Sequence, residues 1–185
     1  TVKIPYFSQE GKKVLYRNPN TLPTGGGMGD WMHINSLSLL GPNPWYDAGD
    51  MRFKPDNIIC SARETNIVFI IDKETGKIVW RLGPDYSGAE YVHIGWIIGQ
   101  HHAHLIPDGL PGAGNLLLFD NGGWAGYGSP HETSKTGEKS AQRDHSRVLE
   151  INPFTLDIIW QYSLNDFGNP FPAAAHHFYS PLMSS

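Results

Sequence analysis

The chain has 185 residues, of which 39% are hydrophobic and 17% charged, a balance typical of a folded domain rather than of a disordered chain. Its formal charge of −4 comes without any cluster of Lys or Arg, so the sequence carries no electrostatic footprint for nucleic acid or for an anionic membrane surface. Its 21 glycines and 14 prolines, beside many β-branched and aromatic residues, favour an all-β fold in which short strands are joined by turns.

The N-terminal segment, residues 1–29, is expected to be the remnant of a repeat unit. It has no apolar h-region of a signal peptide, and no run in the chain approaches the roughly 18 apolar residues of a membrane helix. We therefore expect no membrane span, in a chain that is either cytosolic or has lost a leader. The single cysteine, Cys60, excludes an internal disulfide and is expected to pack as a small hydrophobe.

A first complete unit is predicted over residues 30–84. The segment NIVFIIDKETGKIVWRLGP, residues 66–84, places two β-rich runs around a turn in which Gly76 can adopt a positive φ. Strands are predicted at residues 34–39, 57–62, 67–71 and 78–82. The long connection over residues 41–56 predicts a surface loop, either as decoration or as a lid over a site.

A second unit is predicted over residues 99–164, because SRVLEINPFTLDIIWQYSL repeats the outline of the earlier hairpin. Trp160 follows Trp80 by 80 residues, and both are expected to anchor the core. In the same way His101 follows His33 by 68 residues, so that a histidine opens each unit. Strands are predicted at residues 103–106, 115–120, 147–151 and 158–162, with a second surface loop or lid at 122–145.

Four antiparallel strands per unit describe a blade of a β-propeller, and residues 176–185 are predicted to start a further blade. A propeller needs about four to eight blades to close. Residues 1–185 are therefore expected to form a partial β-propeller domain, either a piece of a longer polypeptide or part of a split ring.

The opening histidines are the leading candidates for chemistry. The first strand of each blade lines the central channel of a propeller, so His33 and His101 are expected to converge there as a catalytic pair. The alternative is a partly buried imidazole that bonds a backbone carbonyl. Regular alternation predicts His102 and His104 on one face and His101 on the other. No Cys or carboxylate stands at a ligand spacing, so we expect neither a metal nor another cofactor.

Other polar residues are candidates for substrate binding, together with His102. Arg63 has the planar donor fork that binds anions, although an ion pair with a carboxylate explains it equally well. Asn121 follows a predicted strand, where it either contacts a ligand or caps a turn. His177 could reach a channel mouth, with surface packing as its alternative. No role is assigned to His93, His131 and His145.

The chain resembles the arylsulfotransferase family, the bacterial aryl-sulfate sulfotransferases. The resemblance spans residues 30–185 and is carried by the order and spacing of five segments: DWMHINSLSLL, NIICSARETNIVFIIDKETGKIVWRLGP, GQHHAHLIPDG, GNLLLFDNGG and SRVLEINPFTLDIIWQYS. It implies a six-bladed β-propeller, usually periplasmic or secreted, that moves a sulfuryl group from a phenolic sulfate ester to a phenol without a nucleotide donor. The partners it implies are small aryl sulfates, phenols and the remainder of the propeller beyond Ser185.

By this resemblance His33 and His101 match two active-site histidines of the family. The family's arginine after FDNG is absent, because Gly123, Trp124 and Ala125 follow that segment here. The histidine that accepts the sulfuryl group is expected beyond Ser185. A non-catalytic propeller that binds an anionic aromatic ligand or a protein partner is the second hypothesis, and a metal- or quinone-dependent propeller enzyme is the third.

Overall fold

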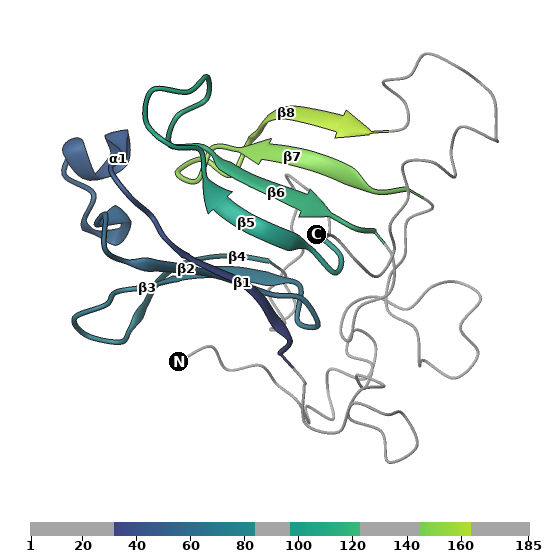
Figure 1. Cartoon of the computed structure of the whole chain (residues 1–185), viewed down its shortest axis with the longest axis horizontal. Helices are drawn as coiled ribbons and strands as arrows, with labels where there is room; N and C mark the ends of the chain where they lie inside the picture. The colour runs from purple at the N-terminus through teal and green to yellow at the C-terminus, as the bar shows by residue number, and fades with distance from the viewer. Residues whose placement is uncertain (1–31, 84–96, 123–144, 164–185) are drawn as a thin grey trace.

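The computed structural model describes residues 32–83, 97–122 and 145–163. These residues form two four-stranded antiparallel sheets, each with its strands in chain order (Figure 1). The all-β class and the four-stranded antiparallel units predicted from the sequence are confirmed. The predicted remnant at 1–29 and the predicted further start at 176–185 lie outside the described residues.

The first sheet contains β1 (Ile34–Leu39), β2 (Ile58–Ala62), β3 (Ile67–Ile71) and β4 (Ile78–Leu82). The second contains β5 (His101–Leu105), β6 (Leu116–Asp120), β7 (Arg147–Ile151) and β8 (Ile158–Ser163). All eight lie where strands were predicted, although β5 begins two residues before the predicted 103. The sequence-based strand assignment is therefore accurate to within one residue at every strand end except the start of β5, in the histidine-rich segment.

The two long hairpins close through side chains that bond the turn backbone. The Oδ1 atom of Asp72 accepts from the backbone N–H of Thr75 at 2.8 Å, and Oδ1 of Asn152 accepts from the N–H of Phe154 at 2.8 Å. Gly76 has φ +66°, as predicted, whereas Leu156 takes the equivalent position of the second hairpin with φ +64°. The capping side chains therefore fix the turn even where no glycine is present.

A hydrophobic core fills the space between the sheets, and Trp80 of the first sheet contacts the second sheet across it. Trp80 is 7% exposed, and its indole N–H donates to the carbonyl oxygen of Pro153 at 2.7 Å. Trp160 is 49% exposed and stacks only on Tyr162 among the described aromatic rings. The prediction that both tryptophans anchor the core is thus confirmed for Trp80 and wrong for Trp160, because no described element covers the Trp160 side of the second sheet.

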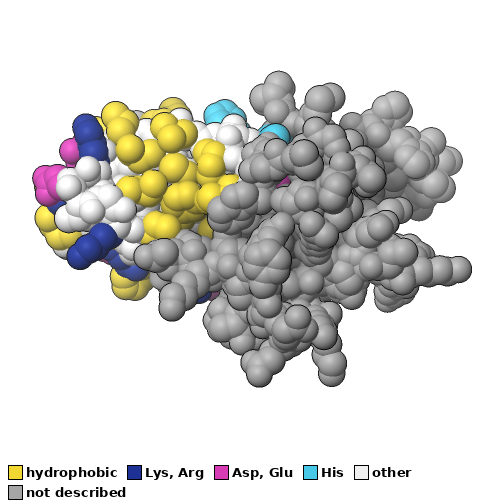
Figure 2. Space-filling model, turned by 90° about the horizontal axis from the view of Figure 1, so that it is seen from below, with side chains coloured by type: hydrophobic (Ala, Val, Ile, Leu, Met, Phe, Trp, Pro, Cys, Tyr) yellow, Lys and Arg dark blue, Asp and Glu magenta, His cyan; other side chains and the backbone are white. Residues whose placement is uncertain are grey.

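The first sheet is apolar on both faces. Strand β3, Ile-Val-Phe-Ile-Ile, contributes alternate residues to the core between the sheets and to a second cluster on the opposite face. Figure 2, seen from below, shows hydrophobic side chains gathered over the described part of the molecule. Cys60 belongs to this second cluster and is 3% exposed, as predicted for a small hydrophobe. A sheet with two apolar faces is typical of a layer placed between two others.

The connection over residues 41–56 folds as the short helix α1 (Pro44–Asp47) and the 3₁₀ turn η3 (Met51–Phe53). Its Trp45 donates through the indole N–H to the carbonyl oxygen of Gly114 at 2.7 Å, and Phe53 is fully buried. The segment follows the carboxyl end of β1, whereas His33 precedes the amino end of that strand. It therefore packs against both sheets, at the opposite end of β1 from His33.

Candidate functional site

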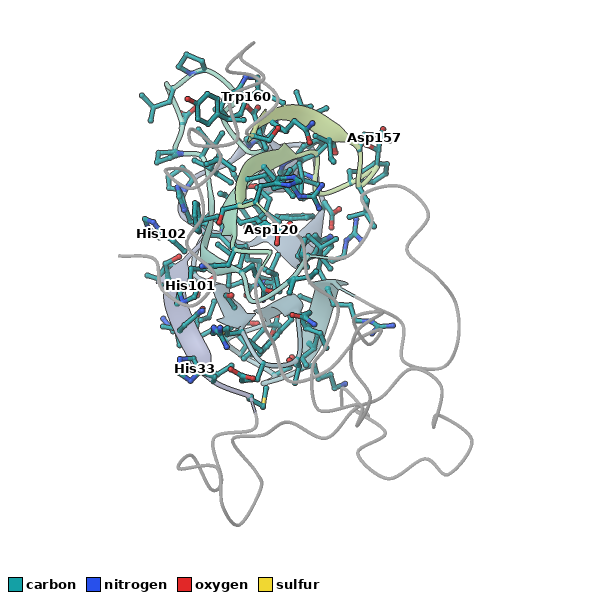
Figure 3. The ribbon with its side chains drawn as sticks, turned by 90° about the vertical axis from the view of Figure 1, so that its right-hand side faces the viewer. His33, His101, His102, Asp120, Asp157 and Trp160 are labelled. Atoms are coloured by element: carbon teal, nitrogen blue, oxygen red, sulfur yellow. The ribbon has the colours of Figure 1, made fainter. Side chains whose placement is uncertain are left out.

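The candidate site lies where the first strands of the two sheets adjoin. Strands β1 and β5 lie side by side, with Asn35 Nδ2 donating to the Gln100 carbonyl at 2.7 Å and the Ala103 N–H donating to Ser36 Oγ at 3.2 Å. His33 immediately precedes β1, and His101 is the first residue of β5. Figure 3 shows His33, His101 and His102 along the same side of the molecule, away from Trp160 and Asp157.

The two histidines do not occupy equivalent positions in their sheets. Two pairs of matching backbone hydrogen bonds fix the equivalence: Leu40 N–H to Asn57 O corresponds to Ile106 N–H to Asn115 O, and Glu64 N–H to Met32 O corresponds to Gly122 N–H to Ile98 O. By this register His33 corresponds to Gly99, and both have a positive φ, +48° and +61°. The predicted match of His33 with His101 is therefore two residues out of register.

A β-bulge in β5 changes the direction of its histidines. His101 is opposite Phe119 and His104 is opposite Leu117, so the two histidines face the same side although they are three positions apart. His102 has φ +52°, and its ring centroid lies 4.6 Å from that of His104. The prediction that His102 and His104 share a face is confirmed. The prediction that His101 takes the other face is wrong, because alternation does not continue across a bulge.

The half-buried ring of His101 makes two contacts through one nitrogen. Its Nδ1 lies 2.7 Å from Asn121 Oδ1 and 3.0 Å from the Gly99 carbonyl oxygen. Burial lowers the pKa of His101 below 6.5, and charge repulsion from Arg63 and His33 lowers it further, although the hydrogen bonds that the ring makes to Asn121 and Gly99 oppose these effects. His33 and Arg63 are thus close enough for their charges to act on the His101 ring.

Arg63 lies in the first sheet at the position that Asn121 occupies in the second, directly after the second strand. Its side chain is 6% exposed and forms an ion pair with Glu64, which is itself buried. Its backbone N–H donates to the carbonyl oxygen of His33 at 3.0 Å. The ion pair that the sequence offered as an alternative is therefore present, and the buried guanidinium also contributes its charge beside His101.

A sequence model described as Arylsulfotransferase (ASST) matches residues 10–185. The chain belongs to the arylsulfotransferase family. This result confirms the family indicated by the five sequence segments, and it supports a function of the arylsulfotransferase type with aryl sulfates and phenols as the general substrate class. No curated protein matches the chain.

The sequence analysis did not identify the buried amides that join the two sheets beside the candidate site. Gln100 is fully buried, and its Nε2 lies 3.1 Å from the Ala62 carbonyl and 3.2 Å from both the Ile67 carbonyl and Ser61 Oγ. Asn66 has φ +55°, and its Oδ1 accepts from the Gly99 N–H at 2.9 Å. The available signal was the polar pair Gly99-Gln100 directly before a strand, where a surface turn is the usual interpretation.

Several residues discussed from the sequence lie outside the described residues. His177, the loop residues Gly123 to Ala125 and the histidines at 93 and 131 all fall there. Within 32–83, 97–122 and 145–163, no three His, Cys, Asp or Glu side chains are grouped to hold a metal ion. None of the helices in those ranges is long and apolar enough to span a membrane.

Proposed function

We propose that this protein transfers a sulfuryl group from an aryl sulfate to a phenol, with His33 and His101 in the catalytic site. The observation that carries the proposal is the convergence of three cationic or ionisable groups. The His101 ring lies within the electrostatic influence of His33 and Arg63, and all three belong to the ends of strands at the junction of the sheets. The family membership supports the same reaction class.

The chemistry explains why these residue types are useful together. Sulfuryl transfer, like phosphoryl transfer, is expected to pass through a loose transition state whose negative charge spreads over the equatorial and leaving oxygens. Donor groups placed around that charge stabilise it most when they are held rigidly in a partly buried site. Arg63 and the imidazoles of His33 and His101 supply such groups from two different sheets.

The reaction is proposed in two balanced steps. In the first, a histidine nitrogen outside the described residues forms a bond to sulfur while the S–O bond to the donor phenolate breaks, and His33 or His101 gives that oxygen a proton. In the second, the acceptor phenol returns a proton to the same imidazole, its oxygen attacks sulfur, and the S–N bond breaks. The protein ends in its starting protonation state.

The site requires walls on all sides, and we propose that a closed six-bladed propeller in a periplasmic or secreted protein provides them. Two features of the sheets support this architecture. The first sheet is apolar on both faces, and Trp160 exposes 49% of its surface at the position where Trp80 is covered by the neighbouring sheet. A further blade packed against Trp160 would bury it as the second sheet buries Trp80.

A non-catalytic propeller that binds an anionic aromatic ligand is the second candidate function. The observation in its favour is the sequence Gly123-Trp124-Ala125 after FDNG, in place of the arginine that the family resemblance leads us to expect. Arg63 offers a cationic group near His101, but it comes from the first sheet and is already paired with Glu64.

Incubation of the full-length protein with para-nitrophenyl sulfate and a phenol acceptor, without any nucleotide, distinguishes the two. The enzyme is expected to release nitrophenol in proportion to the acceptor, and His33→Ala or His101→Ala is expected to slow release roughly 10²- to 10⁴-fold. Asp157→Asn, an exposed change remote from the histidines in Figure 3, is the control and should leave the rate unchanged. Release that persists in both histidine variants would remove these residues from the reaction.

A further inference from the structure

We propose that Asn121 is a positioning residue that holds His101 in a single tautomer. In this tautomer Nδ1 carries the proton, and Nε2 is the nitrogen that exchanges a proton with the substrate. The use of that nitrogen in sulfuryl transfer rests on the proposed function. The tautomer itself does not, because it follows from the groups around the ring. This assigns Asn121 a different role from the ligand contact considered from the sequence.

The oxygens around Nδ1 determine which nitrogen carries the proton. A backbone carbonyl has no hydrogen to donate, so the Gly99 oxygen at 3.0 Å from Nδ1 can only accept. Asn121 Oδ1, at 2.7 Å from the same nitrogen, is also an acceptor. If the Asn121 amide were rotated by 180°, its NH₂ group would face Nδ1, which would then have to be unprotonated to accept from it. The Gly99 carbonyl oxygen would in that case face the lone pair of Nδ1 without a donor. Both oxygens are satisfied only by an Nδ1–H.

Asn121 is held firmly enough to act in this way. It is fully buried, and its carbonyl oxygen accepts from Ser146 Oγ at 2.8 Å. The preceding residue, Asp120, accepts from the Ile98 N–H at 2.8 Å and from Arg147 Nε at 2.8 Å. These bonds connect the end of β6 to the start of β7 and to the segment that enters β5, so the backbone that carries Asn121 is fixed relative to the His101 backbone.

The second oxygen is held just as closely. The Gly99 N–H donates to Asn66 Oδ1 at 2.9 Å, which ties the turn before His101 to the first sheet. Gly99 has φ +61°, a conformation that glycine adopts without strain, and its carbonyl oxygen lies within hydrogen-bond distance of Nδ1 of the ring two residues later. Two acceptors from different segments therefore converge on one ring nitrogen.

The surrounding charges favour the neutral ring. Charge repulsion from Arg63 and His33 disfavours a proton on it, and the nearby carboxylates are paired, Glu64 with Arg63 and Asp120 with Arg147. His102 and His104 lie on the same strand. Burial lowers the pKa of His101, and charge repulsion from Arg63 and His33 lowers it further, so near neutral pH the ring carries Nδ1–H and a lone pair on Nε2. That lone pair can accept the proton of the acceptor phenol, and the imidazolium so formed can give the proton to the leaving phenolate of the next donor.

Nuclear magnetic resonance of the full chain with ¹⁵N-labelled histidine tests the assignment without any substrate. The His101 signals are identified by their loss in His101→Gln. In the wild-type protein we expect long-range ¹H–¹⁵N couplings and nitrogen shifts of the Nδ1–H form above the pKa of the ring. In Asn121→Leu we expect a mixture that moves toward Nε2–H, and in Asn121→Asp a rise of the His101 pKa by roughly one unit or more, because a carboxylate stabilises the imidazolium.

A matched control replaces an amide that caps a turn far from the ring. Asn152→Leu removes the cap of the second hairpin and should leave the His101 signals unchanged. A wild-type His101 with its proton on Nε2 would overturn the proposal before any variant is made, as would an Asn121→Leu protein with an unaltered tautomer. A correct tautomer in a protein without sulfuryl transfer would reject the proposed function alone.

Discussion

The indole N–H of Trp80 in the first sheet donates to the carbonyl oxygen of Pro153 in the second, at 2.7 Å. This bond lies beside a ring pair, Trp80 with Phe53 at 6.4 Å between centroids, so the same side chain serves both the apolar core and the polar link between the sheets. The equivalent tryptophan of the second sheet, Trp160, has no such covering and is half exposed. The pair allows one substitution to be compared in two environments.

Trp80→Phe is expected to lower the free energy of unfolding by about 1–3 kcal/mol, because the Pro153 carbonyl is buried and loses its donor. Trp160→Phe is the matched control and should change it by no more than about 0.5 kcal/mol, as is usual for exposed positions. Urea denaturation followed by circular dichroism measures both. Equal effects of the two substitutions would contradict the bridging role of Trp80.

Gly83, at the end of β4, lies where no side chain fits. A Cβ atom there would meet the carbonyl oxygen of Asn66 and would lie 2.9 Å from the Cα atom of Ile67, and the φ of +136° is unfavourable for any other residue. Gly83→Ala is therefore expected to destabilise the protein by at least about 3 kcal/mol, since backbone atoms must move.

Gly76→Ala provides the comparison for Gly83, because Gly76 also has a positive φ, +66°, but open space around its Cα. At Gly76 the substitution causes only conformational strain, so the free energy of unfolding is expected to fall by about 1–2 kcal/mol. Thermal unfolding of the two variants in parallel separates strain from collision. If Gly83→Ala were no worse than Gly76→Ala, the close approach to Asn66 would be disproved.

The strands were predictable because their signals are local. Apolar runs bounded by Asp72 and Gly76, or by Asn152 and its turn, indicate the two hairpins by composition alone, and the structure forms them with the expected caps. The family was predictable for a related reason, since five short segments keep their order and spacing along the chain.

The geometry around His101 was not predictable in the same way. A β-bulge adds one residue to a strand without any distinctive side chain, and it reverses the expected face of every residue on one side of it. The alignment of His33 with His101 by residue type is a separate error, because the matching backbone bonds pair His33 with Gly99. The effect of the Arg63 charge on the pKa of His101 depends on how the two sheets pack against each other. Residue spacing within one sheet does not predict that packing.

Gln100→Leu is expected to weaken the junction of the sheets by about 1–3 kcal/mol. The change keeps the side chain's approximate volume but removes the amide that bonds Ser61, Ala62 and Ile67. Gln161→Leu on the exposed outer strand β8 is the control and should be nearly neutral. Hydrogen exchange of β2 and β5 amides measures the local effect. Unchanged protection in Gln100→Leu would show that apolar packing alone holds the junction.

The lowered pKa of His101 predicts a dependence of stability on pH. The folded protein binds this proton more weakly than the unfolded chain, whose histidine titrates near 6.5. Above that pH both states are neutral and the group has no effect on stability. As the pH falls below 6.5 the unfolded chain takes up the proton first, so the free energy of unfolding decreases, with a slope of at most about 1.4 kcal/mol per pH unit, until the folded ring is also protonated.

Denaturant titrations from pH values above 6.5 down to the onset of carboxyl protonation test this dependence. Asp50, whose pKa is lowered chiefly by its hydrogen bonds from Arg52, and Asp72, whose pKa is lowered chiefly by Thr75, affect stability only near and below 3.8, so they do not interfere. His101→Gln is expected to remove the part of the decline in unfolding free energy that comes from His101. The difference in unfolding free energy between wild type and variant should therefore change with pH below 6.5. A difference that stays constant across the range would mean that the folded ring binds its proton as readily as the unfolded chain does.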